Sequence, residues 1–288
     1  MTRFLLVPFF VACFGGDIQT IDQRTLQLEV SEETAIELET WAGDLEIIGD
    51  PSRTTAEMDI TLTRVGGLRS DQAGIDALVA TLESNGNTIV ARSFVDIERI
   101  HSFATDVVLR VPADLDAIVN DRSGVVEIEG VGSLELNDDS GDIDILNVAG
   151  DVVVNDDAGD LEIENVGGSV EIRDNSGGIR ITNAGPTSIE DDSGEIDVSD
   201  IDGTLDIQDN SGEIRVTNAG STTIVDDSGE IDVLDIVGDV DIDDNSGDID
   251  VENVTGTVTV DDTSGDIRIR NVGDFDLRSD GSGDVTIK

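Results

Sequence analysis

The sequence is poor in several residue types, and each shortage excludes a class of protein. Its 288 residues include one cysteine, one histidine, one tryptophan, four prolines and no tyrosine. A single cysteine excludes disulfide bonds within the chain. With only one cysteine and one histidine, a metal site built on these two ligand types is also excluded. The shortage of aromatic rings argues against a carbohydrate binder that stacks sugars on such rings.

Positive charge is scarce as well. Lysine and arginine total 16 against 65 aspartates and glutamates, which gives a formal net charge of -49. Such a surface repels nucleic acid and anionic lipid, so neither is expected as a direct partner. The surface attracts cations and suits a salty medium. High charge can also indicate disorder, but the regular spacing of valine, isoleucine and leucine indicates a folded chain.

Long apolar runs are missing too. The first apolar run of the chain is short. The chain opens MTRFLLVPFFVACFGG, with an apolar run from Phe4 to Val11 that is too short to cross a membrane as a helix. Together with Arg3 it is typical of a secretory signal, and Ala12 before Cys13 resembles a bacterial lipoprotein cleavage site. We expect a lipoprotein-type signal peptide at 1–12 and a lipid on Cys13. A plain secretory peptide or a buried thiol are the alternatives.

The segments after the leader differ in their patterns. Residues 13–24 are expected to be a tether, and 25–119 an irregular region that caps or starts the fold. Short runs there, such as LQLEV, AIELET and NTIVAR, alternate apolar and polar residues and predict strands. Helical spacing predicts one amphipathic helix within 70–84, with Ser70 as its cap; its apolar positions are Ile75, Leu78, Val79 and Leu82.

A repeat occupies residues 120–288. Glycines, mostly in Ser-Gly pairs, recur at steps of 17 or 18 residues, at 124, 141, 159, 177, 194, 212, 229, 247, 265 and 283. A second series of glycines falls between them, so each unit is expected to hold two short strands and two turns. Such a period indicates a solenoid, because one unit cannot bury its apolar face without its neighbours. The sequence therefore predicts an all-β fold, a parallel β-solenoid (β-helix) with 17–18-residue coils.

A longer repeat raises the question of coil length. The stretch from Asp174 is nearly repeated from Asp209, 35 residues later. If 35 residues formed one coil, Arg180 would lie on Arg215, and like charges opposite each other are destabilising. With one unit per coil, each arginine has carboxylates on the adjacent rungs. We therefore interpret the longer repeat as a pair of unlike coils.

Two polar rows have structural interpretations. The serine of the Ser-Gly pair recurs in most units, but Ala158 replaces it once, which indicates a need for small volume and not for a nucleophile. His101 has no evident partner for serine catalysis. Asparagines at the other turn are expected to cap backbone groups at the bend; they are Asn147, Asn165, Asn183, Asn218, Asn253 and Asn271.

Calcium is the one cofactor that the sequence suggests, since aspartates offer the hard oxygen ligands that calcium prefers. The candidates are Asp156, Asp174, Asp191, Asp209, Asp226 and Asp244. The spacing matches neither an EF-hand loop nor a calcium-binding nonapeptide roll, so diffuse screening by cations is the alternative.

These features together resemble a known family. A lipoprotein-like leader precedes WAGDLEIIG, a helix pattern, VVLRVPADLDAIVNDRSGVVEIEGVGS and then units of the SGDIDI type. This combination is similar to the bacterial putative-adhesin family of β-strand-repeat envelope proteins, a domain of unknown function. The resemblance covers most of the chain after the tether. It implies a parallel β-solenoid in the cell envelope, and it brings no catalytic residues.

The expected function is that of a non-catalytic, lipid-anchored envelope protein, an adhesin or surface scaffold that binds a surface ligand or an envelope protein. The expected location is the outer membrane, with a secreted or periplasmic protein as the alternative. A polysaccharide-acting β-helix enzyme and a periplasmic scaffold or envelope-stress partner are alternative functions. Unprotected strand edges in the coil at Lys288 would favour end-to-end self-association.

Overall fold

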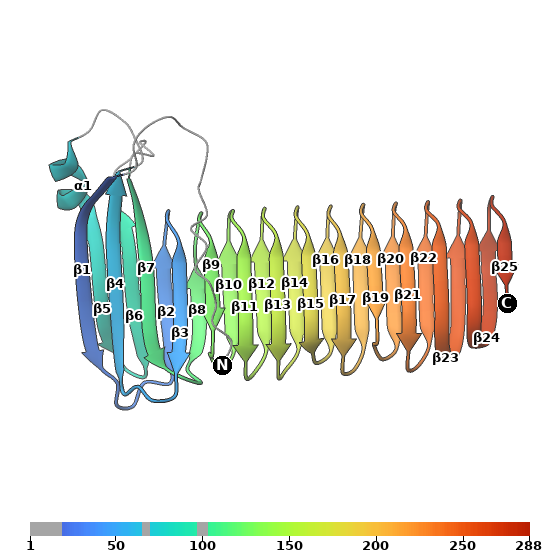
Figure 1. The fold of residues 1–288 in the computed structure, drawn as a ribbon, viewed down its shortest axis with the longest axis horizontal. Coiled ribbons are helices and arrows are strands. Elements are labelled where there is room, and N and C mark those ends of the chain that lie inside the picture. Colours follow the sequence, from blue (N-terminus) through green and yellow to red (C-terminus); the bar gives the residue numbers. More distant parts are fainter. Residues whose placement is uncertain (1–18, 65–69, 97–102) are drawn as a thin grey trace.

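Alternation of apolar and polar residues builds a rod of stacked β-coils, with additional strands at one end (Figure 1). The computed structural model describes residues 19–64, 70–96 and 103–288. Cys13 and His101 lie outside these residues. The predicted parallel β-solenoid is confirmed, because strands one unit apart pair in parallel along the whole repeat.

The strands at the N-terminal end of the rod are β1 (Gln19–Glu29), β2 (Ala35–Thr40), β3 (Leu45–Asp50), β4 (Thr55–Arg64), β5 (Leu78–Asn85), β6 (Thr88–Val95) and β7 (Phe103–Pro112). The short helix α1 spans Asp71–Ala77.

The strands of the repeat are β8 (Asp116–Asn120), β9 (Val126–Glu129), β10 (Leu134–Asp138), β11 (Ile143–Val148), β12 (Val152–Asp156), β13 (Leu161–Val166), β14 (Val170–Asp174), β15 (Ile179–Ala184), β16 (Thr187–Asp191), β17 (Ile196–Ile201), β18 (Leu205–Asp209), β19 (Ile214–Thr217), β20 (Thr222–Asp226), β21 (Ile231–Ile236), β22 (Val240–Asp244), β23 (Ile249–Asp262), β24 (Ile267–Asp280) and β25 (Val285–Ile287). The strands β23 and β24 are longer because each continues around a bend.

The rod has two faces that enclose one aliphatic core. Even-numbered strands from β8 to β22 stack on the first face, and odd-numbered strands from β9 to β21 stack on the second. Ile163 pairs with Ile145 on one side and Ile181 on the other, as the 18-residue spacing predicts. These three side chains are at most 2 % exposed, so the predicted ladder forms the core. Burying each one stabilises the fold by roughly 1.5–3 kcal/mol.

The order of the coils in the rod differs from their order along the chain. On the first face β2 lies between β6 and β8, and on the second face β3 lies between β7 and β9. The chain thus forms one coil from β2 and β3, leaves the stack, and returns to place β6 and β7 outside that coil. Antiparallel strands extend the stack beyond this point, with β5 on β6 and β4 and then β1 on β7.

Two expectations for this end need correction. The predicted helix within 70–84 ends at Ala77, and Leu78, Val79 and Leu82 lie on β5, where they pair with β6. Ser70 occupies the cap position, but its side chain makes no capping hydrogen bond. The segment predicted as a tether up to residue 24 is already a strand from Gln19.

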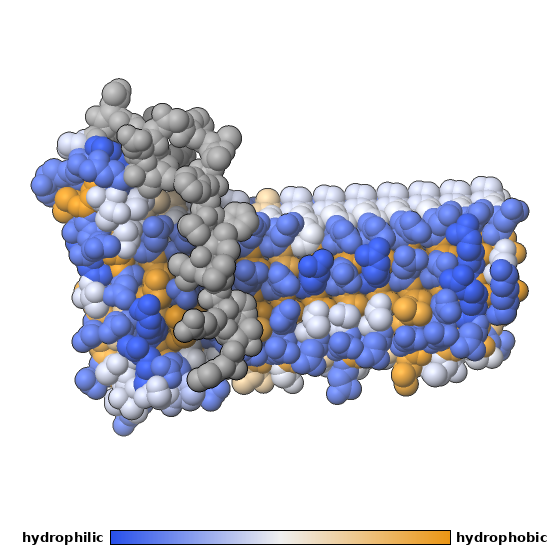
Figure 2. All heavy atoms as spheres, viewed as in Figure 1, coloured by the Kyte–Doolittle hydropathy of each residue, from blue (hydrophilic) through white to orange (hydrophobic). Residues whose placement is uncertain are grey.

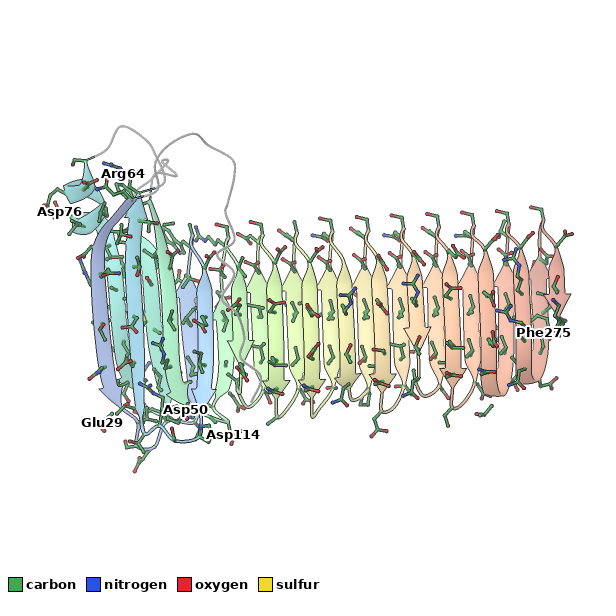
Figure 3. All side chains as sticks on the ribbon, viewed as in Figure 1. Glu29, Asp50, Arg64, Asp76, Asp114 and Phe275 are labelled. Atoms are coloured by element: carbon green, nitrogen blue, oxygen red, sulfur yellow. The ribbon has the colours of Figure 1, made fainter. Side chains whose placement is uncertain are left out.

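The last coil leaves apolar side chains accessible at the end of the rod where Phe275 is labelled in Figure 3. Leu277 is 37 % exposed and Ile287 is 58 % exposed. End-to-end self-association at this coil stays a prediction.

Candidate functional site

The outer surface of the rod carries straight rows of polar side chains, because every coil repeats the same pattern one strand further along (Figure 2). On the second face the outward position reads Glu162, Arg180 and Asp197 on consecutive strands, in direct register. Nε of Arg180 lies 3.7 Å from Oδ2 of Asp197. One unit is therefore one coil, and an arginine has carboxylates on the adjacent rungs as predicted.

Not every arginine uses the adjacent rung. Arg215 forms ion pairs with Glu195 and Glu213, which stand in the turns before two consecutive strands. Arg270 binds Asp250 and Glu252 on the neighbouring strand β23. These pairs are exposed and each contributes little to stability. Their effect is to distribute the few positive charges among the many acids.

The Ser-Gly turns form a ridge along one side of the rod. The hydroxyl of Ser193 donates a hydrogen bond to the carbonyl of Asn175 in the preceding coil, 3.3 Å away. Ser211 and Ser228 do the same with Asp192 and Asn210. The serine hydroxyls thus join neighbouring coils through hydrogen bonds to backbone carbonyls. The sequence interpretation, that this position only needs a small side chain, missed this role. Ala158 lacks the hydroxyl and interrupts this row.

The asparagine row follows the opposite turns. These residues adopt left-handed backbone conformations, with φ of 57° at Asn147 and 60° at Asn165. The side-chain amide of Asn165 donates to Oδ1 of Asn147, 3.3 Å away, and Asn183 donates to Asn165 at 2.8 Å. The predicted ladder therefore exists, but its side chains bond to one another and not to backbone groups of the bend.

A second row of aspartates lies inside the rod. We call these residues the aspartate column; they are Asp121, Asp138, Asp156, Asp174, Asp191, Asp209, Asp226, Asp244 and Asp262. From Asp138 onward each ends a strand of the first face and pairs with its equivalent in the next coil. All nine are 1–5 % exposed.

Hydrogen bonds satisfy half of each carboxyl group in most of the column. Oδ1 of Asp191 accepts the backbone N–H of Ser193, 3.1 Å away, and Oδ1 of Asp209 accepts that of Ser211 at 3.0 Å. Oδ2 is buried without a hydrogen-bond partner in every member. Asp138 lacks partners for both oxygens.

Burial is the largest cause of a raised pKa throughout the aspartate column, and neighbouring acids add to it at most positions. The pKa rises to about 6 at Asp156, Asp191 and Asp226, and to about 7 at Asp138 and Asp244. It is also raised at Asp121, Asp174, Asp209 and Asp262. Carboxyl groups with raised pKa values therefore occur throughout the repeat and not at one break in it.

The calcium candidates all belong to this column. Within residues 19–64, 70–96 and 103–288, no three His, Cys, Asp or Glu side chains form a group that could hold a metal ion. Calcium takes six to eight oxygen ligands, whereas a buried rung offers one carboxyl oxygen without a partner. The geometry gives no support to calcium at these positions, and calcium binding stays a prediction.

An aromatic cluster at the N-terminal end of the rod was not foreseen. Trp41 follows β2 and stacks on Phe94 of β6, with ring centroids 4.2 Å apart. The guanidinium carbon of Arg122 lies 4.3 Å from the centre of the Trp41 ring. Because Phe94 and Arg122 both lie against this ring, Trp41 is not a free platform for a sugar. The only sequence signal was the tryptophan itself.

A hollow of about 350 Å³ lies beside this cluster, lined among others by Glu37, Glu39, Arg92 and Arg122. Asp121 also lines it, and its carboxyl accepts a hydrogen bond from the hydroxyl of Thr40. Burial is the largest cause of a raised pKa at Asp121.

None of the helices in the described part of the chain is long and apolar enough to cross a bilayer.

The coil pattern and its turns match a known family. The model of the family described as Toastrack DUF4097 matches residues 34–234. The chain belongs to this family. The match takes in the strands from β2 to β20 and the first residues of β21. The resemblance expected from the leader, the WAGD segment and the repeat units is thereby confirmed.

The comparison with solved structures found matches of low sequence identity. A putative adhesin from Parabacteroides distasonis is 14 % identical, with 93 % of this chain and 97 % of that one covered and a TM-score of 0.40. A putative lipid binding protein from the same organism is 15 % identical, with 92 % and 94 % covered and a TM-score of 0.35. A putative adhesin from Bacteroides fragilis is 13 % identical, with 93 % and 96 % covered and a TM-score of 0.32. None of the curated proteins compared with the chain matches it.

Proposed function

We propose that this Toastrack protein is a non-catalytic, lipid-anchored protein of the cell envelope that presents an acidic rod as an adhesive or scaffolding surface. The observation that carries the proposal is the unbroken repeat, in which the same outward rows continue from β8 to β24. An active site usually interrupts a repeat, whereas a binding surface can use every coil.

Charge supports the same function. With a net charge of -49, the rod stays soluble and repels anionic membrane surfaces. A lipid on Cys13 would hold it at a membrane that its own surface does not bind, because two or more acyl chains anchor a soluble domain stably. The outer membrane is the proposed location.

The anchor is tested by expression of the full chain in a bacterium supplied with a labelled fatty acid. The wild type is expected to carry the label and to sediment with membranes, and Cys13→Ala is expected to lose both properties. An unlabelled, soluble wild-type protein would contradict the anchor without affecting the proposed surface function.

The surface function is tested with the soluble fragment Gly15–Lys288 immobilised and exposed to envelope proteins and cell-surface glycans, with and without calcium. Selective retention of one component, lost in high salt, is the expected result. Polysaccharides incubated with the fragment should show no new reducing ends. Release of reducing ends would favour the alternative of a polysaccharide-acting enzyme.

A further inference from the structure

The aspartate column places carboxyl groups in a continuous line through the rod. Its members are spaced by one strand, about 4.8 Å, and the register is the same from Asp138 to Asp262. Asp121 extends the line toward the N-terminal end, where it meets Thr40. Alternation along the strand places these residues inward, since Val152 and Val154 precede Asp156 at the same spacing and are both buried.

A column of charged carboxylates would be very unfavourable at these positions. Removing a single carboxylate from water costs several kcal/mol unless it is paired. The charged groups with the largest effects on the column are all acids. Besides the rungs above and below, they are Asp157, Asp160, Asp192, Asp227, Asp248 and Asp280. No positive charge among these groups compensates the column.

We propose that the aspartate column is a proton-binding site in which adjacent carboxyl groups share protons along the axis of the rod. A neutral carboxyl donates its O–H to the unpartnered oxygen of the next rung, so one proton satisfies two buried oxygens. A proton on every second rung would join the carboxyl groups of the column in pairs. The ligand is the hydrogen ion, and the folded chain holds several of them near pH 6.

The first two members illustrate the proposed arrangement. Oδ1 of Asp121 accepts a hydrogen bond from Thr40, and its Oδ2 is buried without a partner. Asp138 has no hydrogen-bond partner for either oxygen, and burial together with the neighbouring Asp121 and Asp156 raises its pKa to about 7. In the proposed arrangement Asp138 is the proton donor and Asp121 the acceptor.

Because of the aspartate column, we expect the folded state to become more stable as the pH falls over a wide range. The pKa values in the folded chain lie above the value of 3.8 for an exposed aspartate. The folded state therefore binds more protons than the unfolded state between about pH 7 and pH 4, and its stability rises as the pH falls through this range. Many proteins lose stability on acidification, because their paired carboxylates become protonated.

The test compares Asp191→Asn with Asp206→Asn. Asp191 is 5 % exposed within the column, and asparagine copies a neutral carboxyl that donates a hydrogen bond. Asp206 is an exposed neighbour on β18, so its replacement makes the same change in net charge outside the column. Urea unfolding of the full chain is measured at pH 8 and at pH 5, and infrared spectra report the carbonyl band of protonated carboxyl groups.

The wild type is expected to be more stable at pH 5 than at pH 8. Asp191→Asn should lose about tenfold of that gain in the folding equilibrium constant, as expected for one group with a pKa near 6. Asp206→Asn should keep the wild-type dependence on pH. A protonated-carboxyl band should be present at pH 6 in the wild type. Its absence, or a wild type less stable at pH 5 than at pH 8, would overturn the proposal.

A metal in place of protons is distinguished in the same experiment. A saturable stabilisation by calcium at pH 8 that Asp191→Asn abolishes would mean that the column binds cations, and the proposal would be wrong. If Asp191→Asn does not fold, the wild-type spectra and unfolding curves still decide the question.

Discussion

The side-chain amide of Asn210 donates a hydrogen bond to Oδ1 of Asp192 in the preceding coil, 2.8 Å away. The same pair recurs between Asn175 and Asp157 and between Asn245 and Asp227. Aspartate and asparagine therefore alternate on consecutive coils from Asp157 to Asn245, and each of these three acids has an amide donor in the next coil. The pairing gives the 35-residue repeat a physical basis beyond the alternation of arginine and acid.

Asn210→Asp should destabilise the rod, because it removes this donor and places three acids on consecutive rungs with Asp192 and Asp227. We expect a loss of about 1 kcal/mol at pH 7, measured by urea unfolding, and a smaller loss at pH 4. Asp192→Asn is the matched control. It keeps a hydrogen-bond acceptor and removes a charge, so it should be neutral or slightly stabilising. Equal losses in both variants would contradict this account of the repeat.

Much of the rod could be predicted because its contacts are periodic. Ile145 and Ile163 are 18 residues apart and one strand apart, so the sequence spacing and the spatial neighbour coincide. The position of β2 between β6 and β8 could not be predicted in this way, because nothing local in the sequence specifies a return to the outer side of an earlier coil.

The helix error has a local cause. Leu78, Val79 and Leu82 fit a helical face, but the same stretch also alternates as a strand. The two-residue loop Gly86–Asn87 joins β5 to β6 as a hairpin, and a short Gly-Asn loop is a hairpin signal. The loop therefore indicates a strand before it, at the position of β5.

From the sequence, members of the aspartate column are named as calcium candidates, but their burial is not predicted. The alternation through Val152 and Val154 already places Asp156 on the inner side, and the periodic strand pattern could have shown this. The hydrogen bonds of the Ser-Gly turn depend on three-dimensional contacts between coils and could not be read from spacing.

Gly194→Ala should be strongly destabilising. Gly194 has a φ of 157°, and an added Cβ would lie 1.5 Å from the carbonyl oxygen of Gly177 in the preceding coil. The coils would have to separate locally, and we expect a loss of about 3 kcal/mol or more. Gly86→Ala is the control, because its φ of 68° is also left-handed while no atom lies near the added Cβ. That variant should lose only about 1 kcal/mol. Thermal unfolding by circular dichroism measures both, and similar losses would show that contact between coils is not the cause.

Protonation of Glu33 should destabilise the folded chain at low pH. Its carboxylate accepts hydrogen bonds from Ser84 Oγ and from the backbone N–H of Ser31 and Glu32, which lower its pKa from 4.5 to about 2. The stabilisation is present above pH 4.5 and is lost as the pH falls toward 2. Glu33→Gln should be less stable than the wild type at pH 6, and the difference should disappear near pH 2. With the aspartate column, this predicts maximal stability of the wild type between about pH 4 and pH 5. A difference that stays constant from pH 6 to pH 2 would assign the effect to packing.

Cations should stabilise the rod through screening. With 65 acidic residues against 16 basic ones, repulsion among exposed carboxylates falls as salt is added. Since no group of three or more acids in the described segments could hold a metal ion, calcium should act no more strongly than magnesium at equal ionic strength. The melting temperature is measured at pH 8 after chelation and then with each cation added back. This measurement decides between general screening and specific calcium binding. Asp206→Asn provides the comparison, since it removes one exposed charge and should weaken both responses equally. A calcium response that saturates and exceeds that of magnesium would instead show specific calcium sites, as the aspartate-rich turns first suggested.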